Sequence, residues 1–158
     1  MNKKRVMFIA STGGHLTELL QLKKMFPKYE YCLITEKTKS NLYLKDIYKE
    51  NIHFLIYGTK HHLFTYVFKL LCNCFISLFY YLKYRPNYII TTGVHTAGPM
   101  CCLGKIFGSK VIYIETFANM VTKTSTGRIL YPICDKFIVQ WESMKELYPK
   151  ADFGGWIF

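Results

Sequence analysis

The chain has 158 residues, 51% of them hydrophobic, so it is long enough to bury one core and is not a disordered tail. Its 21 basic and 10 acidic residues give a formal net charge of +11, which favours anionic lipid, phosphorylated substrates or nucleic acid as partners. No segment has the pattern of a zinc finger, a helix-turn-helix or an RNP motif, and we therefore expect no nucleic-acid partner.

Strand and helix signals alternate along the whole chain. Short apolar runs closed by polar or glycine-rich segments predict strands, and apolar residues three or four apart predict helices. This alternation indicates an α/β fold, a single Rossmann-like domain over residues 1–158 with helices on both faces of a parallel sheet. The predicted strands are Arg5–Ala10, Tyr31–Thr35, Ile52–Tyr57, Tyr88–Thr92, Lys110–Ile114 and Lys136–Gln140, and the predicted helices are His15–Phe26, 62–84, 96–107 and 142–148.

The six cysteines are expected to be reduced, buried and structural. Neither Cys72/Cys74 nor Cys101/Cys102 has the two-residue gap of a zinc knuckle or a redox pair, and they lie in apolar runs. The basic start of the chain leads directly into a predicted strand, so we expect a cytoplasmic chain without a signal peptide.

The first predicted strand ends in a glycine-rich loop, Ser11-Thr12-Gly13-Gly14-His15. In parallel α/β sheets, ligands bind beyond the carboxyl ends of the strands, where this loop is expected. The two glycines allow close backbone approach, and the following helix start offers free N–H groups to an anion such as a phosphate. His15 is a candidate general base, because a neutral imidazole can accept the proton of an attacking hydroxyl. A histidine that only completes the turn is an equally good interpretation.

Further polar residues follow the same strand ends. Glu18 can orient the imidazole or bind a sugar hydroxyl, although a carboxylate that only stabilises the first helical turn is the simpler interpretation. Glu115 suits a sugar hydroxyl, with a solvated loop carboxylate as the alternative. No carboxylate pair or Asp-X-Asp motif occurs, so we expect no metal and no other cofactor. The candidates in the second and third loops are Thr92, Gly93, His95, Glu115 and Thr116.

Residues 63–82 form an apolar stretch of about the length that crosses a bilayer. Lys69 and Asn73 interrupt it, and a spanning helix would place the strands on either side of it across a membrane from one another. We therefore expect the helix at 62–84 to lie in the membrane plane, partly packed on the sheet and partly in the lipid surface. A fully buried core helix is the alternative.

Several separate segments resemble the acceptor subunits of split GT-B glycosyltransferases. The resemblance extends over essentially the whole chain. This family includes the bacterial capsule and exopolysaccharide enhancer subunits and the membrane-recruiting subunit of the eukaryotic GlcNAc transferase that extends the dolichol-linked N-glycan precursor. A one-chain relative, the peptidoglycan lipid-linked GlcNAc transferase, has a Gly-Gly-His loop that matches Gly13-Gly14-His15. The similar segments are 11–15 with Glu18, 92–99, 114–118, 131–135, 137–141 and 148–151.

The resemblance implies that the chain is the N-terminal, acceptor-side half of a GT-B fold, and that a separate partner chain binds the UDP-sugar. The implied reaction is inverting transfer to an undecaprenyl-diphosphate-linked glycan in capsular or exopolysaccharide biosynthesis, at the cytoplasmic face of the bacterial cell membrane. The 11–14 loop would face the diphosphate, with His15 as the base, and the tail at 154–158 would dock the partner or the membrane. A non-catalytic adaptor that recruits and activates the partner is the alternative.

Overall fold

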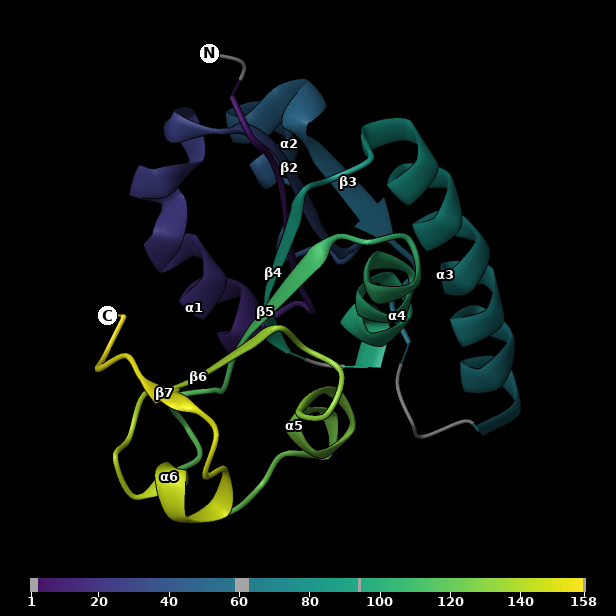
Figure 1. Ribbon diagram of the computed structural model, residues 1–158. Helices are drawn as coiled ribbons and strands as arrows, with labels where there is room; N and C mark the ends of the chain where they lie inside the picture. The colour runs from purple at the N-terminus through teal and green to yellow at the C-terminus, as the bar shows by residue number, and fades with distance from the viewer. Residues whose placement is uncertain (1–2, 59–62, 94, 158) are drawn as a thin grey trace.

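The computed structural model describes residues 3–58, 63–93 and 95–157. At its centre is a seven-stranded sheet in the order β3-β2-β1-β4-β5-β6-β7, in which every neighbouring pair is parallel (Figure 1). The strands are β1 (Arg5–Ala10), β2 (Glu30–Glu36), β3 (Ile52–Leu55), β4 (Tyr88–Gly93), β5 (Lys110–Ile114), β6 (Lys136–Val139) and β7 (Asp152–Phe153). The α-helices are α1 (Gly14–Gln21), α2 (Leu44–Tyr48), α3 (Leu63–Tyr84), α4 (Gly98–Ile106), α5 (Ser125–Leu130) and α6 (Met144–Leu147), and the 3-10 helices are η1 (Leu22–Lys28), η2 (Lys49–Asn51) and η3 (His95–Ala97).

The predicted α/β fold is confirmed, with all six predicted strands and all four predicted helices present. The first helix is shorter than expected. It leaves the α conformation after Gln21 and continues as η1, which contains Pro27, a residue without an N–H to donate. The sequence did not predict α2, α5 or β7, which have 5, 6 and 2 residues, because such short elements carry almost no periodic signal.

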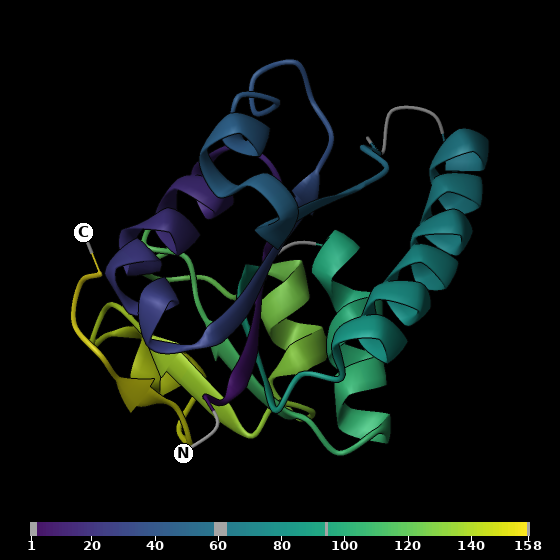
Figure 2. The same cartoon turned by 90° about the horizontal axis from the view of Figure 1, so that it is seen from above.

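The sheet separates two hydrophobic clusters, one on each face. Alternate residues of β1 supply them: Phe8 belongs to the cluster under α1, and Met7 and Ile9 belong to the cluster under α3 and α4. Figure 2 shows α1 and α2 on one side of the sheet and α3 and α4 on the other. A sheet covered on both faces explains why its strands are almost continuously apolar.

The chain reverses its direction of progress through the sheet at β1. It proceeds from β1 to β2 and β3 at one edge, and then returns to place β4 on the other side of β1. In open α/β sheets this switch point opens a crevice beyond the carboxyl ends of the two strands, where ligands bind. The loop after β1 and the loop after β4 therefore meet at the expected position of a site.

The long helix α3 packs on the protein by one side only. Asn73, Ser77 and Tyr81, spaced four residues apart, are buried, and the Asn73 amide bonds both the N–H and the carbonyl of Ile56. The opposite side is apolar and exposed, and we call it the outer face of α3. The alternative of a fully buried core helix is therefore wrong. The outer face consists of Val67, Phe68, Leu71, Phe75, Phe79 and Leu82.

All six cysteines are free, as expected. Only Cys32 and Cys101 are buried, and burial raises the pKa of the Cys32 thiol to about 12. The expectation that all six are buried is wrong, because α3 and α4, which contribute three of the other four, each leave one side open.

Candidate active site

His15 and Thr92 join α1 to β4 across the switch point. The Nδ1 atom of His15 lies 2.8 Å from the carbonyl oxygen of Thr92, and the Thr92 hydroxyl donates to the carbonyl of His15 at 2.7 Å. A carbonyl only accepts hydrogen bonds, so in the neutral imidazole Nδ1 carries the hydrogen and Nε2 carries the lone pair. No described residue bonds Nε2. The ring is thus held in the tautomer that a general base at Nε2 requires.

A bulge in β4 places that carbonyl. Ile9 pairs with Thr91 and Ala10 pairs with Gly93, so Thr92 is one extra residue in β4 relative to β1. A bulge of this kind redirects backbone and side-chain groups and is frequent beside active sites. Here the bulge lies at Thr92, whose carbonyl points toward His15 of α1.

Gly93 allows the imidazole to approach the strand end. Its φ of +113° disfavours any residue with a side chain, and a Cβ at this position would lie 3.0 Å from the Tyr113 hydroxyl and 3.5 Å from Nδ1 of His15. Gly93 therefore permits a close approach to the end of β4, and the group that approaches is the protein's own imidazole.

The loop of residues 11–14 leaves its glycines open. Gly13 has a φ of +84°, both glycines are exposed, and a Cβ built at either position would meet nothing within 4 Å. Gly14 begins α1, whose first N–H groups lack helical partners. An anion has access to this backbone. Ser11, by contrast, is buried, and its hydroxyl turns back to the carbonyl of Thr12.

Thr12 is held by the end of β2 and the loop that follows it, a segment outside the predicted site. Its N–H donates to Glu36 at 3.2 Å, and its hydroxyl lies 3.3 Å from that of Thr38. The Asn41 amide donates to the Glu36 carbonyl at 2.7 Å and to the Thr12 hydroxyl at 3.4 Å. Burial raises the pKa of Glu36, and hydrogen bonds from backbone N–H groups partly oppose the shift. Through these bonds, Thr12 fixes the glycine-rich loop to the end of β2.

Glu18 ties α1 to the loop after β5. Its side chain is 4% exposed, and one carboxylate oxygen accepts from the Thr116 hydroxyl and the Phe117 N–H, both at 2.8 Å. The other oxygen finds no donor among the described residues. Among the described residues Glu18 makes no hydrogen bond to the imidazole, and Thr92 orients the ring instead. The expectation that Glu18 orients His15 is therefore wrong.

Glu115, the residue after β5, is a buried carboxylate. Its side chain is 1% exposed, and its oxygens accept from the hydroxyls of Thr124 at 3.0 Å and Tyr148 at 3.1 Å and from the Thr116 N–H at 3.0 Å. Burial raises its pKa, and these hydrogen bonds partly oppose the shift. Thr124 also caps α5 through the Gly127 N–H. Because Glu115 is buried, it is not a solvated carboxylate and is not open to a sugar hydroxyl. It instead anchors α5 through Thr124.

The predicted residues therefore form two groups. His15, Thr92 and Gly93 meet at the switch point, and Glu18 and Thr116 bond each other behind it. His95 begins η3, but its side chain lies outside the described part of the chain. The described residues contain no cluster of three His, Cys, Asp or Glu side chains that could hold a metal.

The supporting residues that sequence reasoning missed are Glu36, Thr38, Asn41, Thr124 and Tyr148. Glu36 is the last residue of β2, and Thr38 and Asn41 follow it, so the rule that selected the other loops would have found all three. No local pattern marks Tyr148 as a partner of Glu115, because their contact spans 33 positions.

Comparisons with known proteins place the chain among oligosaccharide biosynthesis proteins. The family described as "Oligosaccharide biosynthesis protein Alg14 like" matches residues 6–157. A human protein named UDP-N-acetylglucosamine transferase subunit ALG14 is 26% identical over 180 residues, covering 95% of this chain and 81% of that protein. The Kluyveromyces lactis protein of the same name is 45% identical over 84 residues, covering 47% of this chain and 34% of that protein.

Two solved structures share the fold. MurG from Acinetobacter baumannii has a TM-score of 0.72 at 20% identity, over 89% of this chain and 42% of the MurG chain. The UDP-N-acetylglucosamine 2-epimerase from Rickettsia bellii has a TM-score of 0.72 at 14% identity, over 99% of this chain and 46% of that chain. This chain thus corresponds in fold to less than half of each protein. Since the family match extends over nearly its full length, the chain belongs to the Alg14-like family of oligosaccharide biosynthesis proteins.

Proposed function

We propose that this chain is the acceptor-binding subunit of a two-component glycosyltransferase whose partner chain binds the UDP-sugar. Its relatives are named as subunits of a UDP-N-acetylglucosamine transferase, and its fold corresponds to less than half of a MurG chain. The observation that carries the proposal is the bond between His15 Nδ1 and the Thr92 carbonyl, which leaves Nε2 as a base beside open backbone N–H groups.

In the proposed reaction, the acceptor hydroxyl attacks the anomeric carbon of the UDP-sugar. Nε2 of His15 takes the hydroxyl proton as the new glycosidic bond forms. The bond between the anomeric carbon and the UDP oxygen breaks, UDP leaves with the electron pair, and the configuration inverts. The acceptor diphosphate lies against Gly13, Gly14 and the start of α1, where the helix dipole favours negative charge.

A lipid-linked acceptor requires the subunit to work at a membrane surface, and the outer face of α3 supplies a contact for it. Phe68, Phe75 and Phe79 are 69%, 73% and 62% exposed there. Residues 51–114, which contain α3 and α4, include no Asp or Glu and six Lys or Arg, a balance that suits anionic lipid. We propose that α3 lies in the plane of the membrane at its cytoplasmic face.

Length and composition alone also allow α3 to span a bilayer. Thr65–Tyr84 is long and apolar enough to cross, and 17% of the apolar 18-residue window within it is buried in the protein. Burial of the Asn73 amide against Ile56 favours the in-plane arrangement, because a spanning helix would have to leave the sheet and expose those polar groups to lipid.

The tail offers a contact for the partner chain. Trp156 is 61% exposed, and its ring lies 5.3 Å from that of Phe117 and 5.1 Å from that of Trp141. An aromatic cluster with one exposed ring is typical of protein interfaces. We propose that it docks the donor-binding chain.

The test uses the chain copurified with its partner. His15→Gln is expected to lower kcat by about 10²- to 10⁴-fold while copurification persists, since the variant loses the base and keeps a similar size. Normal turnover by this variant would instead favour the alternative, a non-catalytic adaptor that recruits the partner. The native acceptor is proposed to be an undecaprenyl-diphosphate-linked glycan of capsular or exopolysaccharide biosynthesis, and a comparison of undecaprenyl and dolichyl acceptors tests this part separately.

A further inference from the structure

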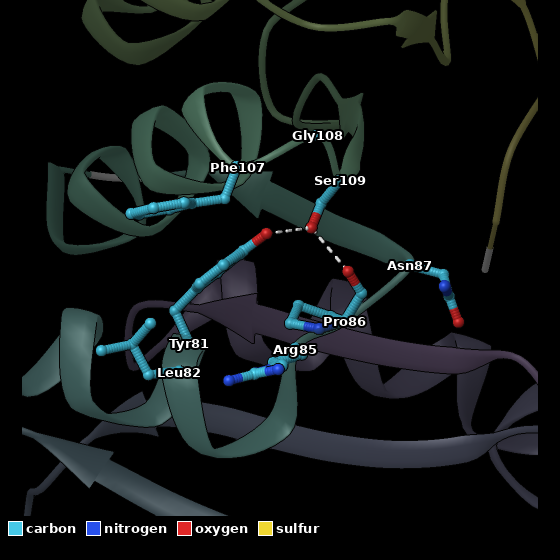
Figure 3. A pocket seen from close by; sticks show the side chains of 8 residues that line it. All are labelled: Tyr81, Leu82, Arg85, Pro86, Asn87, Phe107, Gly108 and Ser109. Atoms are coloured by element: carbon cyan, nitrogen blue, oxygen red, sulfur yellow. Dashed lines mark hydrogen bonds between the residues drawn. The ribbon is translucent and has the colours of Figure 1, made fainter.

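A pocket of about 430 Å³ lies at the amino-terminal edge of the sheet, away from the candidate active site. It opens between the end of α3 and the turn after α4, just before β4 and β5 begin (Figure 3). Hydrogen bonds join three of the lining residues to one another. The Tyr81 and Ser109 hydroxyls lie 2.7 Å apart, and Ser109 donates to the Pro86 carbonyl at 2.5 Å. The lining residues are Tyr81, Leu82, Arg85, Pro86, Asn87, Phe107, Gly108 and Ser109.

Arg85 gives this pocket a positive charge. It is exposed, and no acidic side chain pairs with it among the described residues. Lys83 adds a second exposed cation on the last turn of α3, and neither α3 nor α4 contains an acidic residue. An anion entering the pocket therefore meets no carboxylate from either helix.

The backbone of Arg85 is strained for a residue with a side chain. Its φ is +42°, directly after the last residue of α3, where glycine is the usual choice. Strained residues cluster at ligand sites, so this conformation is in keeping with a ligand-binding role of the Arg85 side chain. This observation is independent of the pocket's charge and shape.

The rim of the pocket is apolar and continues onto the outer face of α3. Leu82 belongs to both, and it is 50% exposed. On the other side, Phe107 stacks on Tyr81 at 5.3 Å and is 53% exposed, and the neighbouring Ile106 is 75% exposed. In Figure 3 the Arg85 side chain lies on the Leu82 side of the pocket, with Asn87 on the other side. A cation beside an apolar rim is the arrangement that fits a phosphate with acyl chains attached.

We propose that this pocket binds the headgroup of an anionic membrane phospholipid, with the phosphate on Arg85 and the acyl chains along Leu82 and Phe107. The inference rests on the proposed membrane contact of α3 and deepens it, because it assigns one lipid class to one end of the helix. The bound lipid would fix the rotation of α3 in the surface and so direct the active-site edge toward the acceptor.

The first test measures binding to phosphatidylcholine vesicles with and without phosphatidylglycerol. Arg85→Gly keeps the left-handed backbone without strain, so thermal unfolding should be no easier than in the wild type. We expect this variant to lose at least tenfold in affinity for the anionic vesicles. Lys83→Gln, which removes one charge from the same turn, should lose about fivefold at most, the effect of a single cation near an anionic surface. Equal losses in the two variants would mean unspecific attraction and would overturn the proposal.

The second test separates the pocket from the membrane contact. Dihexanoyl-phosphatidylglycerol below its micelle concentration should shift the amide resonances of Gly108 and Ser109 in the wild type and not in Arg85→Gly. Inorganic phosphate should shift them much less, because it has no acyl chains for the apolar rim. If the wild type fails to bind vesicles but gives these shifts, the membrane role of α3 fails and the pocket stands. If the soluble lipid gives no shifts, the pocket proposal fails.

Discussion

The carbonyl oxygen of Thr92 lies 2.8 Å from Nδ1 of His15 and fixes the tautomer of a residue 77 positions away in the sequence. The Thr92 hydroxyl also donates a hydrogen bond to the His15 carbonyl, so the two residues join the first turn of α1 to the end of β4. A base held in this way needs no carboxylate partner, because the backbone carbonyl does the orienting.

Gly93→Ala should destabilise the fold and displace the imidazole. The φ of +113° is unfavourable for alanine, and the new Cβ would lie 3.0 Å from the Tyr113 hydroxyl. We expect a loss of about 1–3 kcal/mol in the free energy of unfolding, measured by urea denaturation, together with a lower kcat. Gly98→Ala is the matched control, since its Cβ would meet nothing within 4 Å and it should change neither quantity appreciably. Equal effects of the two substitutions would contradict the proposed role of Gly93.

Glu18→Ala should weaken the link between α1 and the loop after β5. The substitution leaves the Thr116 hydroxyl and the Phe117 N–H without their buried acceptor. A loss of about 2–4 kcal/mol in unfolding free energy is expected, because hydrogen bonds to charged groups are the stronger ones. Glu18→Gln keeps an acceptor oxygen and should recover part of the loss. If Glu18→Ala unfolds like the wild type in a urea titration, the link contributes nothing.

Glu36 and Glu115 should make stability fall as the pH rises. Burial raises the pKa of both carboxyls above the ordinary value of 4.5, so between that value and the raised pKa the folded state binds more protons than the unfolded state. Their contribution is therefore fully present below pH 4.5 and is lost as the pH rises through the folded-state pKa.

The matching measurement compares urea unfolding across pH in the wild type and in Glu36→Gln. The variant should show a smaller decline of stability above pH 4.5, because glutamine does not titrate. Glu142→Gln is the control, since this carboxylate is exposed. Parallel pH curves for the wild type and Glu36→Gln would show that Glu36 titrates alike in the folded and unfolded chain.

Phe75→Ser combined with Phe79→Ser should reduce vesicle binding and leave the fold intact. Both side chains are mostly exposed on the outer face of α3, so unfolding free energy should change by less than about 1 kcal/mol. Binding to vesicles should fall by at least tenfold, since each buried phenylalanine contributes about 1.5–3 kcal/mol. Ile129→Ser removes an apolar side chain of similar exposure from α5, and its vesicle binding should match the wild type. A similar loss in Ile129→Ser would argue against a specific role of α3.

The strand pattern and the glycine-rich loop could be predicted because they are local. Apolar runs closed by polar residues identified β1 to β6, and the rule for parallel sheets placed the loops after β1, β4 and β5 at one edge. The same rule applied to β2 would have reached Glu36 and Asn41. The contact between Trp156 and Phe117 lay beyond such rules, because it depends on β5, β6 and β7 being neighbours.

The sequence by itself determined the alternation of strands and helices, the glycine-rich turn into α1 and the apolar length of α3, since each depends on residues close together in the chain. Tertiary structure decided which groups touch. The bulge at Thr92, the bond from Glu18 to a residue 98 positions away and the side of α3 left uncovered all depend on strand order and register. Periodicity reports how a segment folds, whereas hydrogen bonds across a sheet depend on which segments become neighbours.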